Sequence, residues 1–401
     1  MRFNALTSRI AALLFSVLIP AACFAYDPDA RAAEADSIRN TSEMQQEHVE
    51  KKKEGFDPGE MIMEHISDAH EWHIVGHTHI PLPVILKTDK GWEVFSSNNF
   101  HNEATEELQP YQGKFYTYAL NEKGKIVVMS GAAENEEATK NLFDLSITKN
   151  VVTLFVIVLL MLWMFTSVAK AYKRKPGQSP RGLQSFIEPL IIFIRDDIAK
   201  ASIGKKYEKF MPYLLTVFFF ILFSNLLGLI PVFPGGANFT GNIAITASLA
   251  LLTFIITTIN GNGHYWRHIF AMPGVPAGVL IILTPIEILG MFLRPFVLMI
   301  RLFANISAGH IIALAFYSLI FIFGDNGKAV GAGLGVSVVS VAFTVFMMFM
   351  ELLVAFLQAY VFALLSAIYF GSAVEEHHHG EEHGHDADDG LIAAHAHTVA
   401  H

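Results

Sequence analysis

Long stretches without a charged side chain are the feature that most constrains the fold of this chain. Residues 150–169 and 211–266 contain no Asp, Glu, Lys or Arg. A helix needs about 20 apolar residues to cross the roughly 30 Å hydrocarbon core of a bilayer. Only 16% of all residues are charged, whereas soluble domains carry about a quarter. We therefore predict an all-α membrane protein for residues 148–372.

The first 25 residues have the pattern of a secretory signal peptide. Two arginines precede a short apolar run, and Ala22–Ala25 offers small residues for cleavage. The alternative is a lipoprotein site at Cys23, but Pro20 then stands where an aliphatic residue is expected. We expect cleavage after residue 25, which puts the following residues outside the cytoplasm. The single cysteine excludes a disulfide within the chain.

Residues 26–147 form a polar region that is rich in acidic side chains. Two pairs of β-type runs in it flank short turns that end in glycine. The pairs are Ile80–Lys87 with Trp92–Ser96, and Phe115–Leu120 with Lys125–Met129. We predict two β-hairpins in a small exported N-terminal region.

Histidines are concentrated at two places. His73, His77 and His79 lie at the start of the β-containing region, and the tail at residues 373–401 is rich in His and acidic residues. Zinc binding is one interpretation of each set, but no regular ligand pair supports it. We expect exposed polar side chains at the first place and a solvated, disordered tail at the second. No metal or cofactor is predicted.

Five membrane-crossing helices are expected, together with one helix that lies along the interface. The first span, Asn150–Lys170, ends in a basic cluster that marks the cytoplasmic side, formed by Lys170, Lys173, Arg174, Lys175 and Arg181. Leu183–Lys200 places apolar residues at helical spacing and charges on other faces, which predicts an amphipathic interfacial helix. Five spans from an exported N-terminal region leave the C-terminus in the cytoplasm.

The last two apolar segments are too long for upright spans. At about 1.5 Å per residue, Val279–Phe323 would reach roughly 65 Å and Ser337–Phe370 roughly 50 Å. Helices that exceed the bilayer thickness by this much must tilt or break. We predict two steeply tilted helices, joined at Gly324–Gly335.

Charges inside these two segments are the main functional candidates, because charges at bilayer depth are costly. Glu287, Arg294 and Arg301 are seven residues apart, so they drift by only about 20° per step and share a helical stripe. Asn305 lies one turn beyond Arg301, whereas His310 faces a different environment.

On the second segment Glu351 and Gln358 share a face. One arginine on a stripe at bilayer depth, with titratable groups elsewhere along the hairpin, suits a proton path that is interrupted by a fixed positive charge.

Three motifs carry a resemblance to subunit a of the membrane sector of the rotary F-type ATP synthase of bacteria. Arg301-Leu302-Phe303-Ala304-Asn305 is similar to the motif that holds the family's essential arginine, Leu357–Phe362 to its last helix, and Asn225–Pro231 to the end of an earlier span. The resemblance covers roughly residues 145–372. Some bacterial members have Glu at the position of His310 and His at that of Glu351, so this chain has the exchanged pair.

The resemblance implies a non-catalytic, proton-translocating stator subunit in the cell inner membrane. Its partners would be a ring of c subunits, the peripheral stalk b subunits and the remainder of the ATP synthase. Protons would enter from the exported side past Asn242, His310, Glu287 and Glu351. They would neutralise a carboxylate of the ring and leave by a second half-channel.

The resemblance also implies a role for Arg301. This side chain would keep the ring carboxylate ionised and would block a leak between the half-channels, with Gln358 and Asn305 orienting it. A secondary transporter or an ion channel is the alternative function, and a membrane anchor for the exported region is a third. No internal repeat supports the transporter, and the anchor leaves the charges unexplained.

Overall fold

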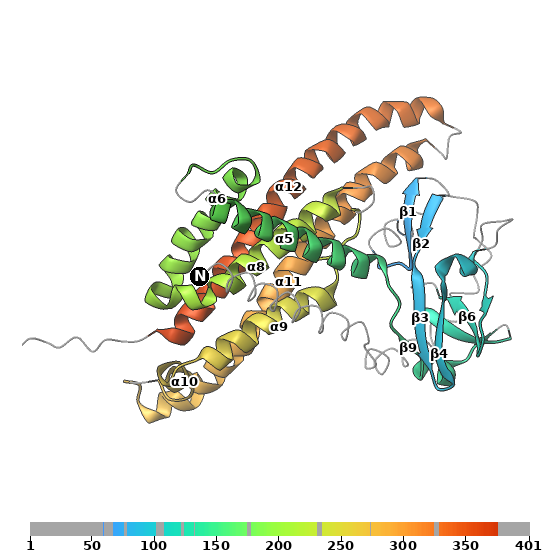
Figure 1. The fold of residues 1–401 in the computed structure, drawn as a ribbon. Helices are drawn as coiled ribbons and strands as arrows, with labels where there is room; N and C mark the ends of the chain where they lie inside the picture. The colour runs from blue at the N-terminus through green and yellow to red at the C-terminus, as the bar shows by residue number, and fades with distance from the viewer. Residues whose placement is uncertain are drawn as a thin grey trace, which may run out of the picture.

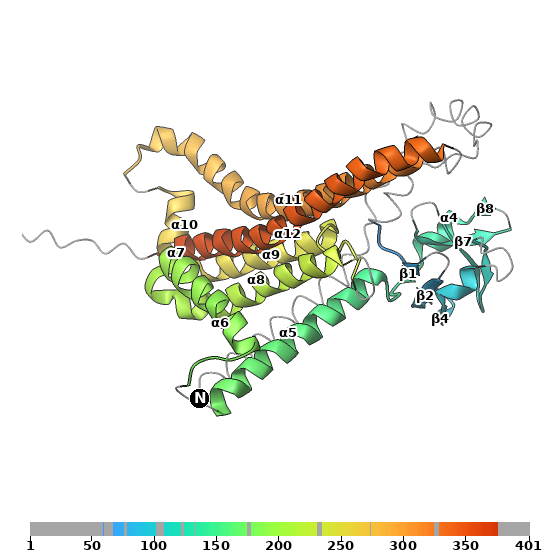
Figure 2. The same cartoon turned by 90° about the horizontal axis from the view of Figure 1, so that it is seen from above.

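The computed structural model contains a bundle of long helices with a smaller β-containing region at one end (Figures 1 and 2). It describes residue 59 and residues 67–375, apart from 76–77, 102–107, 122–123, 132, 175–177, 231–234, 273 and 325–328. The predicted signal peptide lies outside the described residues, as does the tail beyond residue 375.

Three antiparallel sheets make up the β-containing region within the described residues. They have the strand orders β1-β2, β4-β3-β9 and β5-β6-β7-β8. The strands are β1 (Glu71–Val75), β2 (Thr78–Pro81), β3 (Pro83–Thr88), β4 (Gly91–Ser96), β5 (Tyr111–Gln112), β6 (Thr117–Leu120), β7 (Ile126–Ser130), β8 (Ala133–Glu134) and β9 (Phe143–Asp144).

Both predicted hairpins are confirmed, as β3 with β4 and β6 with β7. Alternation explains why β3 forms, since Val84 and Leu86 are fully buried while their neighbours are not. The turn into β4 needs Gly91, whose φ of 140° is rarely open to other residues. The sequence analysis did not predict the hairpin of β1 with β2 or the two-residue strand β9.

The β-containing region joins the helices through a short hydrogen-bonded segment. The backbone N–H of Lys149 donates to the carbonyl of Ala69 at 2.9 Å, and that of Asn150 donates to Oδ1 of Asp68 at 3.1 Å. Burial raises the pKa of Asp68 above its ordinary value, although bonds from Thr148 and Asn150 oppose this. The residues that lead into β1 therefore contact the first turn of the first long helix.

Five helical segments are long and apolar enough to cross a membrane, as the sequence predicts. The helices of the bundle are α5 (Lys149–Arg174), α6 (Leu183–Phe193), α7 (Ala201–Ile203), α8 (Tyr207–Leu229), α9 (Ile243–Asn260), α10 (Gly263–Phe270), α11 (Ala277–Phe323) and α12 (Val330–Val374). A π-helical turn, η4 (Ile194–Lys200), and a 3-10 turn, η5 (Gly204–Lys206), link α6 to α8. Two short elements, η3 (Ser97–Phe100) and α4 (Glu136–Lys140), lie in the β-containing region.

Helix α8 is the centre of the bundle. Its middle residues are apolar all round, and Phe218, Phe219 and Phe220 are almost fully buried among the neighbouring helices. In the segment that ends with α8, 83% of the residues in an apolar stretch of 18 are buried. The corresponding share is 17% in α11 and 11% in α12. Helices α11 and α12 therefore have large apolar faces that no other described part of the chain covers.

Helices α11 and α12 form the predicted long hairpin. They pack against each other from Arg294 onward along α11 and are joined by residues 324–329, within the predicted connection (Figure 2). Helix α11 runs without interruption through both Pro285 and Pro295, so the excess length does not break it. Figure 2 shows that the first half of α11 curves away from the bundle.

Candidate functional site

A titratable pair faces a cavity between α11 and α12. Nδ1 of His310 lies 3.5 Å from Oε1 of Glu351, and both side chains are largely buried. The cavity beside them has a volume of about 190 Å³. Its lining contains the pair, the polar side chains of Asn238, Tyr317 and Thr344, and apolar residues of α8, α11 and α12.

Gly309 makes room for the carboxylate of this pair. A Cβ atom at Gly309 would lie 2.6 Å from Oε1 of Glu351. The Glu351 side chain therefore occupies space that a larger residue on the facing helix would fill. A Cβ atom at Gly228 would be only in ordinary contact with His310, at 3.7 Å from its Nε2. The close approach of the imidazole and the carboxylate therefore depends on Gly309.

The cavity has the size and the polar groups that water requires. Oδ1 of Asn238 is buried and has no hydrogen-bond partner among the described residues. A cavity measured in this way needs about 10–15 Å³ to hold one water molecule, so this one has room for several. A polar, roomy space beside two titratable groups can pass protons between water and side chains.

Asn225 fixes one wall of this region. Its Nδ2 donates to the carbonyl of Ala355 on α12 at 3.3 Å, and its Oδ1 accepts from Oγ1 of Thr240 at 2.6 Å. The first bond ties α8 to α12, and the second ties α8 to the loop that carries Asn238. This gives the Asn225–Pro231 motif a structural role.

Arg301 lies near the middle of α11 on its uncovered side. Arg301 and Asn305 are both exposed, whereas Leu298 and Leu302 on the adjoining face of the helix are buried. Within the described residues no hydrogen bond or ion pair of the Arg301 guanidinium is found. A permanent charge is therefore presented on an apolar surface.

Gln358 contacts the backbone of Arg301. The Gln358 side chain is buried, and its Nε2 donates to the carbonyl of Arg301 at 3.4 Å. The sequence analysis expected Gln358 to orient the guanidinium itself. The bond instead holds α12 against α11 at the level of the arginine, because the acceptor is a backbone oxygen.

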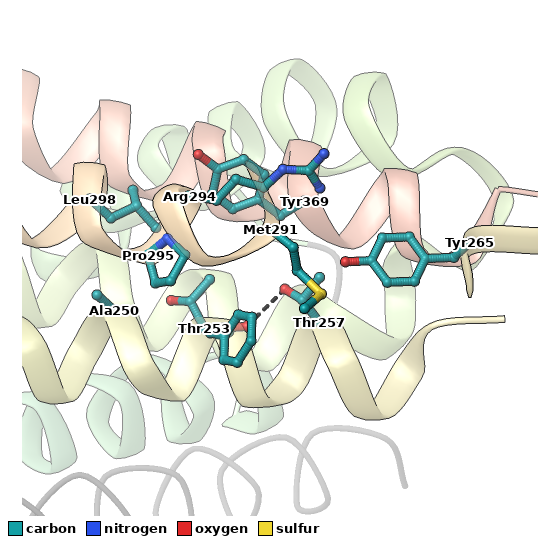
Figure 3. Close-up of a pocket in the computed structure, with 10 residues that line it drawn as sticks. Ala250, Thr253, Thr257, Tyr265, Met291, Arg294, Pro295, Leu298 and Tyr369 are labelled. Carbon is teal, nitrogen blue, oxygen red and sulfur yellow. Dashed lines mark hydrogen bonds between the residues drawn. The ribbon is translucent and has the colours of Figure 1, made fainter. Parts of the chain in front are cut away.

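Arg294 lies in a second, smaller pocket on α11. Its guanidinium is 5.7 Å from the ring centroid of Tyr369, which is a cation–π distance. The pocket has a volume of about 10 Å³, which is room for about one water molecule. Figure 3 shows Arg294 beside Tyr369, with the hydroxyl of Tyr265 directed into the pocket. Thr257 closes it from α9, where its hydroxyl donates to the carbonyl of Thr253 at 2.8 Å.

The order along α11 corrects one expectation. Glu287 comes 23 residues before His310 on the same helix, which is roughly 34 Å of rise. Arg301 lies between them, so Glu287 does not lie with the His310–Glu351 pair. Glu287 lies on the same side of Arg301 along α11 as Arg294 does.

Asn242 is also outside the cavity of the pair. It caps α9, where its Oδ1 accepts from the backbone N–H of Ala244 at 2.9 Å. The residue of this loop that lines the cavity is Asn238, which the sequence analysis missed together with Tyr265, Tyr317, Thr344 and Tyr369. One signal for Asn238 was present in the sequence: an amide in an uncharged loop between two spans.

The membrane part matches the family model described as ATP synthase A chain over residues 151–371, which is more than half of the chain. The chain belongs to the ATP synthase subunit a family. ATP synthase subunit a of Chloroherpeton thalassium is 43% identical over 61% of this chain and 71% of the relative. The corresponding values are 45%, 61% and 68% for subunit a 2 of Chlorobaculum tepidum, and 43%, 61% and 78% for subunit a of Myxococcus xanthus.

Membership of the subunit a family confirms the function that the three motifs implied. The chain is a multi-pass membrane protein of a bacterial ATP synthase and its non-catalytic, proton-translocating stator subunit in Fo. The N-terminal region matches a second family model over residues 61–146, described only as a domain of unknown function, DUF8433.

Proposed function

We propose that Arg301 separates two proton half-channels, which meet a ring of c subunits at the uncovered face of α11 and α12. The observation that carries this proposal is an exposed guanidinium near the middle of a long apolar helix, with one polar pocket on each side of it along that helix.

The uncovered face supports a protein partner with an acidic group. A charged side chain that faces lipid at mid-bilayer depth is rare because of its cost, and such groups pair with one another or face the interior of a bundle. A carboxylate on a neighbouring helix would satisfy this guanidinium. The arginine would in turn favour the ionised carboxylate.

The His310–Glu351 cavity is proposed as the exported-side half-channel. The C-terminal half of α11 points to the end of the bundle where the β-containing region lies (Figure 2). His310 lies nine residues beyond Arg301 in that direction, or roughly 14 Å. A proton that enters from that end therefore meets the pair before it meets the arginine.

The pocket of Arg294, with Glu287 further along α11, is proposed as part of the cytoplasmic half-channel. It lies on the side of α10, at the end of the bundle opposite the β-containing region (Figures 1 and 2). That end also carries Lys170, Arg174 and Arg181, which line a common pocket at the end of α5. Such a basic cluster is typical of cytoplasmic flanks.

The proposed division of the chain follows from this orientation. Residues 1–25 are a signal peptide, 26–147 are exported, 148–372 form the membrane domain and 373–401 are a cytoplasmic tail. The protein lies in the cell inner membrane, and the peripheral stalk b subunits hold it in place beside the ring.

Substitution of Arg301 tests the proposal. In inverted membrane vesicles that contain the assembled complex, Arg301→Ala is expected to abolish ATP-driven proton pumping, while ATP hydrolysis by the detached catalytic head is unchanged. Arg301→Lys is expected to be nearly as damaging, because lysine lacks the planar fork and loses its proton more easily when buried.

Arg294→Ala is the matched control, because it removes the same side chain from the same helix about 10 Å away. Pumping is expected to fall less in this variant. An assembled Arg301→Ala complex that pumps at nearly the wild-type rate would refute the proposal. Uptake of a solute by that complex would favour the alternative function of a secondary transporter.

A further inference from the structure

Three potential metal ligands from separate segments converge in the β-containing region. Glu71 is the first residue of β1, His79 lies on β2, and His101 directly follows η3. One ligand atom from each lies within 4.8 Å of the other two. Nε2 of His101 is 2.6 Å from Oε2 of Glu71, and the ring centroids of the two histidines are 4.6 Å apart.

We propose that Glu71, His79 and His101 bind a divalent transition-metal ion of the zinc type. Two imidazoles and one carboxylate are a common donor set for zinc, with bonds of about 2.0–2.2 Å. Ligand atoms around a tetrahedral ion of this size lie roughly 3.4 Å apart. The Glu71–His101 separation is 2.6 Å and no separation exceeds 4.8 Å, so adjustments of roughly 1 Å in the side chains complete the site.

The backbone already holds the three residues in place. Glu71 and His79 lie on the same face of the β1–β2 hairpin, because Glu71 pairs with Pro81 and His79 pairs two residues further along β1. The backbone N–H of Ser97, in η3, donates to the carbonyl of Leu82 at 3.0 Å. Phe100, next to His101, is fully buried. The ligands therefore come from a pre-formed frame.

The surroundings also suit a metal site. Oδ1 of Asn98 lies 3.3 Å from Nε2 of His79 and can fix the orientation of that ring, as the outer partners of metal-binding histidines do. The side chains of Glu71 and His101 are only 18% and 15% exposed. A metal ion would neutralise the carboxylate and would also use both imidazoles in their neutral form. A simple Glu71–His101 ion pair uses only one of them.

The site would stabilise the junction with the membrane domain. Asp68, which accepts the backbone N–H of Asn150 in α5, is three residues before Glu71. An ion that ties β1, β2 and η3 together would therefore restrict the segment from which the first span begins. This inference is independent of the proton path.

Zinc binding to the full-length chain in detergent micelles tests the proposal. The histidines of the tail and of residues 26–66 remain in every variant, so any zinc they bind is common to all. The wild type is expected to bind one zinc ion more than His79→Gln/His101→Gln, in a titration against a chromophoric chelator. Glu71→Gln is expected to weaken this binding at least tenfold, and the control His268→Gln, an exposed histidine of α10, is expected to leave it unchanged.

Hydrogen–deuterium exchange locates the ion. Zinc is expected to slow amide exchange at least tenfold in peptides that cover 71–81 and 97–101 of the wild type, and not in the double variant. Copper is expected to compete with zinc, and magnesium is not, since it prefers oxygen ligands. Equal zinc stoichiometry in wild type and double variant, or zinc protection that persists in the double variant, would overturn the site. Exchange without zinc checks that Glu71→Gln and the double variant are folded.

Discussion

Oε1 of Glu351 and Nδ1 of His310 lie 3.5 Å apart because Gly309 leaves the space that the carboxylate occupies. One residue of α11 thus supplies the imidazole, and its neighbour supplies the room for the acid from α12. The pair and its glycine form a single local arrangement. Two predictions follow from treating it as one proton-transfer unit.

The first concerns the identity of the two groups. His310→Ala is expected to reduce ATP-driven pumping at least about tenfold, by analogy with the 10²–10⁴-fold contribution of a positioned acid or base. The double exchange of His310→Glu with Glu351→His is expected to pump faster than either single exchange, since an acid and an imidazole are still present. Losses that simply add, with no rescue in the double variant, would show that the two sites act independently.

The second concerns the glycine. Gly309→Ala would bring a methyl group to 2.6 Å from Oε1 and 3.0 Å from Cγ of Glu351, so this side chain must move. Gly290→Ala on the same helix meets nothing within 4 Å. Both changes favour the helix intrinsically by up to about 1 kcal/mol. We expect a several-fold loss of pumping for Gly309→Ala alone, measured in vesicles with equal amounts of assembled complex. Equal pumping by the two variants would count against the role of this contact.

The third prediction concerns topology. A protease added outside spheroplasts is expected to cleave within residues 26–147 and to leave the His-rich tail intact. After the spheroplasts are lysed, the tail is expected to be digested, which serves as the control for its accessibility. Digestion of the tail in intact spheroplasts would contradict an exported N-terminal region followed by five spans.

The course of the helices could be predicted from the sequence because it depends on local composition. Long apolar runs set the five spans, and β-type runs on either side of Thr88–Gly91 set the β3–β4 hairpin. The length of α11 was also predictable. Its continuity through Pro285 and Pro295 was less so, because a proline can either break or bend a long helix.

The composition of the candidate site was harder to predict because it depends on contacts between distant segments. Helical spacing correctly put Arg301 and Asn305 on one face, which is a local property. The proton path implied by the resemblance put Glu287 together with His310, although 23 residues of α11 separate them. The bond of Thr240 to Asn225 holds the loop from which Asn238 reaches the cavity. Glu71 contacts His101, which is 30 positions further along the sequence. Neither contact produces a periodic pattern in the sequence from which it could be predicted.

The last prediction concerns the packing of α12 against α7. A Cβ atom at Gly371 would overlap the carbonyl oxygen of Ser202 and would lie 3.0 Å from its carbonyl carbon and 3.5 Å from Cα of Ile203. These are backbone atoms, so no rotamer change relieves the contact, and the two helices must separate. Overpacking of this kind costs about 1–3 kcal/mol.

Gly335→Ala is the matched control, because the same methyl group on the same helix meets nothing within 4 Å. We expect Gly371→Ala to lower the thermal midpoint of the detergent-purified chain and to reduce its amount in assembled complexes, while Gly335→Ala leaves both unchanged or raises the midpoint slightly. Since Gly371 lies 13 residues beyond Gln358 on α12, separation at this point would also loosen the bond from Gln358 to the Arg301 carbonyl. Pumping per assembled complex should therefore fall together with stability. Wild-type stability and assembly in Gly371→Ala would mean that α7 is not packed as closely on α12 as the structure has it.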